Sequence, residues 1–480
     1  MKTTTIKNVF GLWLSAGLLL SMNSCSDFLK EESQDEVIPR TVVDYKELLM
    51  GSGYQGKEEP STFVYFLDDD VEFNLLDENV VGSNDARRDR LQFTWQPSFV
   101  NYDGNGLEIA SSPGSTPYAR YYAWIMGCNA VLDNINAAIG TEPERNRVKA
   151  EALAVRAIYY FQLANLYGEP YTANPESLSI PLKLHSGIEE TYSKRATVKE
   201  VYTQVVGDLE EALRLMEPLQ IIRGDFHINQ RAIHTFLSRV YLHMNNWEQT
   251  IKHADAVFES GGRVAMLLPF VGAATGGSNT YLNYDNPEVE WVFGGYTQPS
   301  QSTYMPSLDV VSSFETADVR LSYLGKASPA THYYLVSKLV SGTQLTQVIR
   351  SSEALLNRAE AYAELKNTAA ATADLNLLRS NRITNYANQN FTSAEDALEA
   401  IRTERRKEFC YEGFRWFDLR RYGRPAIEHR YQEEVGGPIL TFTLTKNDPM
   451  YTLPFPSSLF TNNPGFVQNP SALMGERVGK

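Results

Sequence analysis

The densest group of carboxylates in this 480-residue chain is Asp68-Asp69-Asp70, with Glu72 two residues further on. Carboxyl groups could act as the acid–base pair of a glycosidase or bind Ca²⁺. A glycosidase needs two carboxyls about 5–9 Å apart across a cleft, and consecutive residues do not face each other in that way. The spacing also differs from that of a helix–loop–helix calcium loop. The sequence favours a solvated or helix-capping acidic stretch, and a cation site remains the alternative.

Nucleophilic and cofactor chemistry find little support in the sequence. There is no Gly-x-Ser-x-Gly elbow and no Gly-x-Gly-x-x-Gly or Walker-type loop. The seven histidines have no evident serine or cysteine partner, and no Cys-x-x-Cys pair or His/Cys cluster suggests structural zinc. We therefore expect a protein without a metal or cofactor that is not an enzyme.

Side chains suited to holding a sugar are found in two irregular regions, residues 51–118 and 263–350. Sugar rings have apolar faces bordered by hydroxyls, so they are recognised by flat aromatic rings together with amides, carboxylates or arginine. Large irregular insertions in a helical body are often functional. For each aromatic residue, ordinary packing is the competing interpretation. The expected ligand contacts are Trp95, Tyr296 and Tyr304, followed by Asn101, Tyr102 and Trp291.

The composition restricts the classes of partner and the redox chemistry. The formal net charge of −14 argues against a broad nucleic-acid-binding surface. Aromatic residues make up 11% of the chain and include 27 tyrosines, which can stack on sugars or peptides. Beyond residue 25 the cysteines are Cys128 and Cys410, each inside an apolar helical pattern. This setting favours two buried thiols over a disulfide.

The N-terminus has the layout of a secretion signal. Two lysines precede an apolar run at residues 9–20, which is shorter than the about 20 residues of a membrane span. Short residues then lead to Cys25, so the layout predicts a lipoprotein signal peptide over residues 1–24 and a membrane anchor on Cys25. The alternative is an ordinary cleaved signal with an incidental cysteine. The polar, acidic residues 25–42 are expected to form a tether.

Apolar periodicity predicts a helical body after the first irregular region. Long helices are expected at residues 121–139 and 145–167, the second ending at Gly168. Two helix pairs with short turns follow, and they resemble tetratricopeptide repeats, although any helical hairpin shares this pattern. The expected pairs are residues 232–244 with 247–260 and residues 352–365 with 368–382.

These segments predict a mainly α fold in one domain over residues 43–480. Tetratricopeptide-like hairpins would form a curved scaffold, and the irregular segments would form a large loop-rich binding face. The N-terminal part would cover residues 43–230 and the C-terminal part residues 231–480.

A specific resemblance comes from residues 393–424. They contain Arg-x-Glu-Arg-Arg and then Glu-Gly-x-Arg-Trp-Phe-Asp-Leu-Arg-Arg, which resembles the C-terminal signature of the SusD/RagB family. Four further stretches resemble the family in the same order, so the resemblance spans nearly all of the mature chain. Those stretches are residues 124–135, 150–168, 352–365 and 451–470.

The signature itself is expected to be scaffold. Arg402, Arg405, Arg406 and Glu408 lie at helical spacing beside Glu404, which suggests an ion-pair ladder along one helix. The following Arg415, Asp418 and Arg420 are expected to tie the chain end to the helical body through bidentate pairs.

The resemblance implies a lipid-anchored protein on the outer face of a Gram-negative outer membrane. Such a protein captures a glycan and delivers it to a SusC-like TonB-dependent barrel, over which it closes as a lid. Family members bind ligand with loops from the two irregular regions. The resemblance therefore implies which regions of this chain bind ligand, but not which individual residues. Peptide capture of the RagB type and a structural subunit that contacts no ligand are the alternatives.

Overall fold

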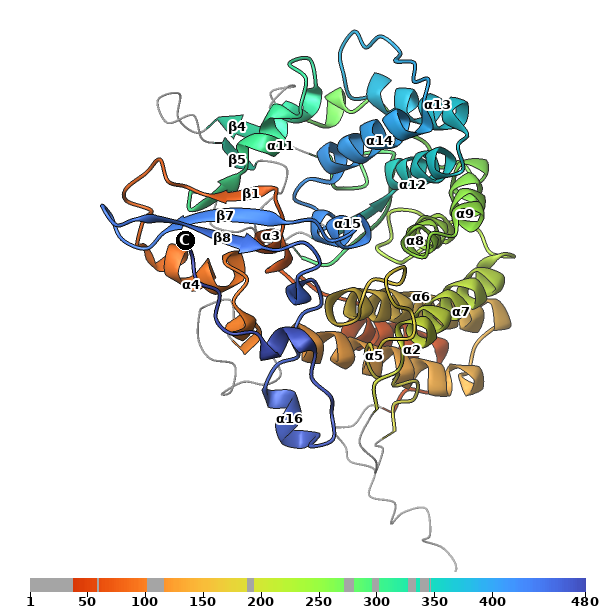
Figure 1. Cartoon of the computed structure of the whole chain (residues 1–480). Coiled ribbons are helices and arrows are strands. Elements are labelled where there is room, and N and C mark those ends of the chain that lie inside the picture. The colour runs from red at the N-terminus through yellow and green to blue at the C-terminus, as the bar shows by residue number, and fades with distance from the viewer. Residues whose placement is uncertain are drawn as a thin grey trace, which may run out of the picture. The chain divides into compact units, whose positions relative to one another are not determined.

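Helices that pack in antiparallel pairs form the larger part of the structure (Figure 1). Residues Thr41–Lys480 make one compact unit, and residues 38–40, the described part of the unit Met1–Arg40, have no regular structure. Among the described residues, no helix is long and apolar enough to cross a membrane. The computed structural model describes residues 38–57, 60–101, 116–187, 194–271, 280–295, 302–326, 334–336, 345 and 347–480.

The N-terminal helices begin and end at local sequence signals. Thr141 and Glu144 form a capping box at the start of α6, with the Thr141 amide 2.9 Å from a Glu144 carboxylate oxygen. Gly168 ends α6 as expected, but its φ of −105° is not left-handed. A Cβ at Gly168 would lie 2.6 Å from the Ser179 hydroxyl, so the glycine permits a close approach. These helices are α2 (Val42–Leu48), η2 (Leu49–Gly53), α3 (Val64–Leu67), α4 (Asn84–Phe93), η3 (Pro97–Asn101), α5 (Pro117–Asn134), η6 (Ile135–Ala137), α6 (Glu142–Tyr167) and α7 (Val198–Met216).

Two helix pairs lie close to their predicted positions: α8 (Gln230–His243) with α9 (Trp247–Glu259), and α12 (Ser351–Glu364) with α13 (Thr368–Ser380). Their turns are alike. Asn245 and Lys366 have φ of 55° and 60°, and the following Asn246 and Asn367 cap the second helix of each pair. Helix α9 packs on α12, so the two pairs stack as neighbouring repeats (Figure 1). The expected mainly α fold with tetratricopeptide-like hairpins is confirmed.

The irregular regions come together through short strands. β1 pairs with β3, which places Val71 opposite Pro306 and Phe73 opposite Tyr304, so residues from both predicted irregular regions share one ladder. In Figure 1, β1, β7 and β8 gather with α4 on the side away from α7 and α9. In the described chain the antiparallel pairs are β1 (Val71–Phe73) with β3 (Tyr304–Pro306), β2 (Val289–Phe293) with β6 (Gln347–Arg350), β4 (Leu324–Lys326) with β5 (Tyr334–Val336), and β7 (Ile427–Gln432) with β8 (Ile439–Leu444).

The remaining helices carry the signature and the tail. Helix α14 packs on α12 and α13, which places the signature against the stacked pairs. Cys128 and Cys410 are both buried and no disulfide joins them, in line with the sequence. These helices are η7 (Leu268–Phe270), α11 (Leu308–Ser312), η8 (Val319–Tyr323), α14 (Ala394–Phe409), α15 (Arg415–Arg421), η9 (Pro449–Tyr451), α16 (Ser458–Asn462) and η10 (Pro470–Leu473).

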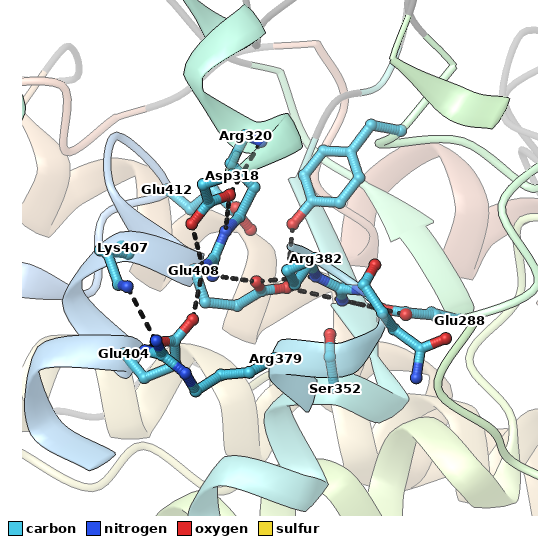
Figure 2. A network of polar contacts seen from close by, with 12 residues as sticks. Glu288, Asp318, Arg320, Ser352, Arg379, Arg382, Glu404, Lys407, Glu408 and Glu412 are labelled. Atoms are coloured by element: carbon cyan, nitrogen blue, oxygen red, sulfur yellow. Dashed lines mark hydrogen bonds and ion pairs between the residues drawn. The ribbon is translucent and has the colours of Figure 1, made fainter. Parts of the chain in front are cut away.

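A buried network of charges surrounds α14 (Figure 2). Glu408 accepts hydrogen bonds from Arg320 at 2.9 Å, from Arg350 at 2.8 Å and from Arg382 at 2.9 and 3.0 Å. The side chains of these four residues are at most 1% exposed. Removing one partner from such a network leaves an uncompensated buried charge, which typically costs about 3–5 kcal/mol.

Glu404 is the second acidic centre of this network. It bonds to Arg320, to Arg379 at 2.6 Å and to Lys407 at 2.9 Å. Burial raises the pKa of Glu404, but the charges of Arg320, Lys407 and Arg379 outweigh burial and hold this pKa at about 2. The carboxylate therefore stays ionised in the folded protein.

The partners of the signature differ from the expected ladder along one helix. Arg402 bonds to Glu360 and Glu364, and Arg405 to Asp418. Glu404 and Lys407 form the one pair along α14 among the described contacts. Because α14 is packed among other helices, Arg402 and Arg405 find their partners on other elements. Arg420 also differs, since it donates to backbone carbonyls and has no carboxylate partner in the described chain. Those carbonyls are of Tyr451, Asn165 and Gly168.

Candidate functional site

The acidic cluster Asp68-Asp69-Asp70 binds arginines of the signature. Both oxygens of Asp69 accept from Arg415, at 2.6 and 2.7 Å, and Asp70 accepts from Arg406 at 2.6 Å. The three carboxylates could approach one ion, since one oxygen from each lies within 4.8 Å of the others. Two guanidinium groups already pair with Asp69 and Asp70, however. The expectation of a solvated or capping stretch is wrong for Asp69 and Asp70, which join the N-terminal segment to the signature. Glu72 does cap a helix, since it accepts from the Leu308 amide at the start of α11.

Three of the predicted ligand contacts lie in the core. Trp95, Trp291 and Tyr304 are 0%, 2% and 1% exposed. Their polar groups donate to backbone carbonyls: Trp95 to Leu67 at 3.0 Å, Trp291 to Phe226 at 3.0 Å and Tyr304 to Ala86 at 2.8 Å. Their rings stack or meet edge-on with neighbouring aromatic side chains. These side chains present no face to a ligand in this structure, so the competing interpretation of packing describes them better.

Asn101 differs from these three, since it is only half-buried and lies on a surface hollow. Tyr102 and Tyr296, like the predicted anchor residue Cys25, lie outside the described residues. We call this feature the Asn101 hollow, and its volume of about 480 Å³ is within the usual range of ligand sites. It is lined by Pro97, Ser98, Val100, Asn101, Pro454, Phe455, Ser457, Phe460, Gln468, Ala472, Met474 and Glu476.

Polar contacts fix the walls of the Asn101 hollow. The Asn101 side-chain oxygen accepts from the Ser457 amide at 2.9 Å, which joins η3 to the tail. The Gln468 side chain bonds to both the amide and the carbonyl of Phe455, each at 2.9 Å. These contacts hold two planar amides and a ring in fixed positions, as recognition of a sugar requires.

Aromatic rings form the floor and one rim of the hollow. Phe455 is buried and stacks on Tyr167 with ring centroids 4.8 Å apart. Phe466 meets Phe455 edge-on at 5.0 Å and Phe460 at 5.9 Å. Phe460 is half-buried, so part of its ring faces the solvent. An apolar face with amides and hydroxyls beside it suits one side of a sugar ring.

A second hollow adjoins the first through Gln468, which lines both. We call it the Arg195 hollow, and its volume is about 540 Å³. The Arg195 guanidinium lies 4.9 Å from the centroid of the Phe455 ring, so the side chains that line the two hollows are in contact. The Arg195 hollow is lined by Glu169, Ala173, Asn174, Ser177, Leu178, Arg195, Arg424, Thr452, Val467, Gln468, Asn469 and Pro470.

A third space lies where both irregular regions meet the helices and the signature. Gln55, Phe293 and Gln347 line it together with Gln162 of α6 and Phe417 of α15. Its volume is about 80 Å³, room for a few waters at about 10–15 Å³ each. It does not have room for an oligomer.

The described lining of the Asn101 hollow offers rings and polar groups that could bind a ligand. Glu476 is the one carboxylate among the residues that line it. Glycoside hydrolysis uses a pair of carboxyl groups on opposite sides of the bond. The side chains present therefore support recognition of rings and hydroxyls.

Sequence reasoning overlooked Phe455, Phe460 and Gln468 as candidates for binding. The tail was recognised only as a stretch that resembles the family, and its residues were not weighed as ligand contacts. A signal was present, since three phenylalanines and a glutamine fall within fourteen residues interrupted by prolines. Segments without a helical pattern are often surface loops that carry binding residues, so their aromatic side chains are candidates for ligand contact.

The comparisons with known proteins agree with this architecture. One family model, described as starch-binding and associating with the outer membrane, matches residues 27–242, and the model of the SusD family matches residues 332–471. The SusD-like protein P2 of Formosa agariphila is 24% identical over 94% of this chain and 98% of its own length. The SusD-like protein P38 of the same species is 22% identical over 72% of this chain and 78% of its own length.

Solved structures share the fold. A SusD superfamily protein from Bacteroides thetaiotaomicron superposes with a TM-score of 0.70 at 24% identity, over 90% of this chain and all of that one. A SusD-like carbohydrate-binding protein from Bacteroides vulgatus superposes with a TM-score of 0.69 at 22% identity, over 89% and 97% of the two chains. With its stacked helix pairs, its signature and these matches, the chain belongs to the SusD/RagB family.

Proposed function

We propose that this protein captures a glycan at the cell surface and delivers it to a SusC-like TonB-dependent outer-membrane barrel. The observation that carries the proposal is the Asn101 hollow, where Asn101 and Gln468 are held beside the Phe455 and Phe460 rings. Membership of a family whose model is described as starch-binding and associating with the outer membrane supports the same class of ligand and the same location.

Binding in the hollow would use both its aromatic rings and its polar groups. A sugar ring would lie with its apolar face on Phe460, and its hydroxyls would reach the Asn101 amide, the Ser98 hydroxyl or Glu476. A neighbouring unit of the same oligomer would extend past Gln468 into the Arg195 hollow. Capture of this kind involves no bond chemistry, so we propose a binding protein and not an enzyme.

The N-terminal features complete the proposal. Residues 1–24 would be removed as a signal peptide, Cys25 would carry the lipid anchor, and residues 25–42 would tether the domain of residues 43–480 to the membrane. Mass spectrometry of the membrane-extracted protein tests this arrangement. Diacylglycerol on an N-terminal Cys25 is the expected result, and an unmodified cysteine would contradict it.

Calorimetric titration tests the binding function. The protein lacking residues 1–25 is titrated with plant, host and microbial oligosaccharides and with peptides of matched length. We expect saturable binding of one glycan class at micromolar to millimolar affinity. Binding of peptides alone would favour RagB-type capture, and binding of neither class would favour a structural subunit of the transporter complex.

A further inference from the structure

Arg195 is an arginine without an acidic partner. Its guanidinium donates to the carbonyls of Ser179 at 2.5 Å, Leu178 at 2.6 Å and Val467 at 3.0 Å, and to the side-chain oxygen of Asn469 at 2.8 Å. Among the described residues, no carboxylate lies within ion-pair distance of it. These oxygens orient the guanidinium and accept from four of its five N–H donors, but they do not cancel its charge.

The hollow around Arg195 is positively charged on an acidic protein. Its lining has two guanidiniums and one carboxylate, so its formal charge is 2 − 1 = +1, whereas the chain carries −14. Arg424 bonds to Glu169 at 2.8 Å, which leaves Arg195 as the uncompensated group. Burial lowers the pKa of Arg195 to about 10, and the side chain therefore stays protonated at neutral pH.

Two further features suit an anion with acceptor oxygens. Thr452 lines the hollow and is only 4% exposed, and its hydroxyl has no hydrogen-bond partner in the described chain. A buried hydroxyl without a partner is costly, and it can donate to a ligand oxygen. The planar guanidinium, a weakly hydrated cation, suits carboxylate and sulfate oxygens better than neutral hydroxyls.

The Arg195 hollow is also continuous with the candidate sugar site. Gln468 lines both hollows, and Arg195 lies over the Phe455 ring that forms the floor of the first. An oligomer that places one ring on Phe460 can therefore place a neighbouring unit beside Arg195.

We propose that the Arg195 hollow binds an anionic substituent, a carboxylate or a sulfate ester, of the glycan held in the Asn101 hollow. This inference rests on the proposed function and specifies its ligand as an acidic oligosaccharide. The substituent supplies the negative charge that the carbonyl groups around Arg195 lack, while the sugar rings make the contacts in the Asn101 hollow.

The test adds a charge to the hollow without removing Arg195, whose contacts also tie segments of the fold together. Ala173 lines the hollow and is exposed, so Ala173→Glu introduces a competing carboxylate and Ala173→Gln is the control of matched size. Both variants and the unchanged protein are titrated with a neutral galactan tetrasaccharide, a galacturonate tetrasaccharide and a sulfated carrageenan tetrasaccharide at low and high salt.

We expect at least one acidic probe to bind more tightly than the neutral probe, with affinity that falls as salt rises. Ala173→Glu should weaken that binding by about fivefold or more, and Ala173→Gln by less than about twofold. The probe that responds, galacturonate or carrageenan, distinguishes a carboxylate from a sulfate. Equal effects of the two substitutions on acidic probes, or tighter binding of the neutral probe, would overturn the inference while the capture function stands. Failure of all glycans to bind in the calorimetric panel would remove the function itself.

Discussion

Around α14, Arg320 and Arg382 each bond to two or more carboxylates, whereas Arg195 in the Arg195 hollow bonds to carbonyls and an amide. Both settings hold the guanidinium through hydrogen bonds, but only the first cancels its charge. An uncompensated charge in the interior is costly, and the arginines around Glu408 avoid it through carboxylate partners. The buried Arg420 is the contrasting case, since carbonyls alone hold it in the described chain. At the surface hollow the remaining charge is available to a ligand. The comparison separates buried arginines whose charge is cancelled by carboxylates from Arg195, which lies at a surface hollow and which we assign to recognition.

Substitution of Glu408, the central acid of the network, should have the largest effect on the stability of the fold. Glu408→Gln leaves Arg320, Arg350 and Arg382 without a shared counter-charge, so we expect a loss of about 3–5 kcal/mol in the free energy of unfolding. Chemical denaturation followed by circular dichroism measures it. The control Glu399→Gln changes an exposed residue of the same helix and should stay within about 0.5 kcal/mol. Equal stability of the two variants would contradict a structural role for the network.

The acid response of the fold should follow from Glu404. Its folded-state pKa of about 2 lies below the ordinary value of 4.5, so the unfolded chain binds the proton more readily. The stabilisation from this group is fully present above about pH 4.5 and is lost as the pH falls towards 2. Free energies of unfolding measured between pH 6 and pH 2 should therefore decline, and Glu404→Gln should decline less steeply. Parallel curves for both proteins would show that Glu404 is not a source of the acid response.

The smallest effect on stability, together with a clear effect on binding, is expected at the rim of the Asn101 hollow. Phe460→Ala removes an aromatic face that is half-buried, so the fold should persist while affinity for a bound glycan falls about tenfold. Leu377→Ala is the control, since it removes a large apolar side chain that is 45% exposed on α13, outside the hollows. A similar loss of affinity in both variants would show that the effect is not specific to the hollow.

The helix pairs could be predicted because their periodicity and turn residues are local. Asn245 and Lys366 lie at the turns in left-handed conformations, and the helices begin and end within two residues of the predicted bounds. The pairing of Asp69 with Arg415 joins residues 346 positions apart, and no local pattern in a single sequence reveals such a contact.

The binding residues were harder to predict for a related reason. Trp95 and Tyr304 are residue types that can stack on a sugar. Strand pairing and the packing of distant segments bury them in the core instead. Asn101 was identified because its planar amide can bond to sugar hydroxyls, and the residue stays half-buried at a hollow in the structure. Phe460 and Gln468 became candidates only when the tail folded back beside η3.

Calorimetric titration of the double variant Asn101→Ala, Phe460→Ala tests the central claim most directly, with Leu377→Ala as control and the best-binding oligosaccharide of the panel as ligand. The account predicts that the double variant keeps the circular dichroism spectrum of the unchanged protein and loses most of its affinity, while the control binds normally. Unchanged affinity in the folded double variant would contradict the assignment of the Asn101 hollow as the glycan site.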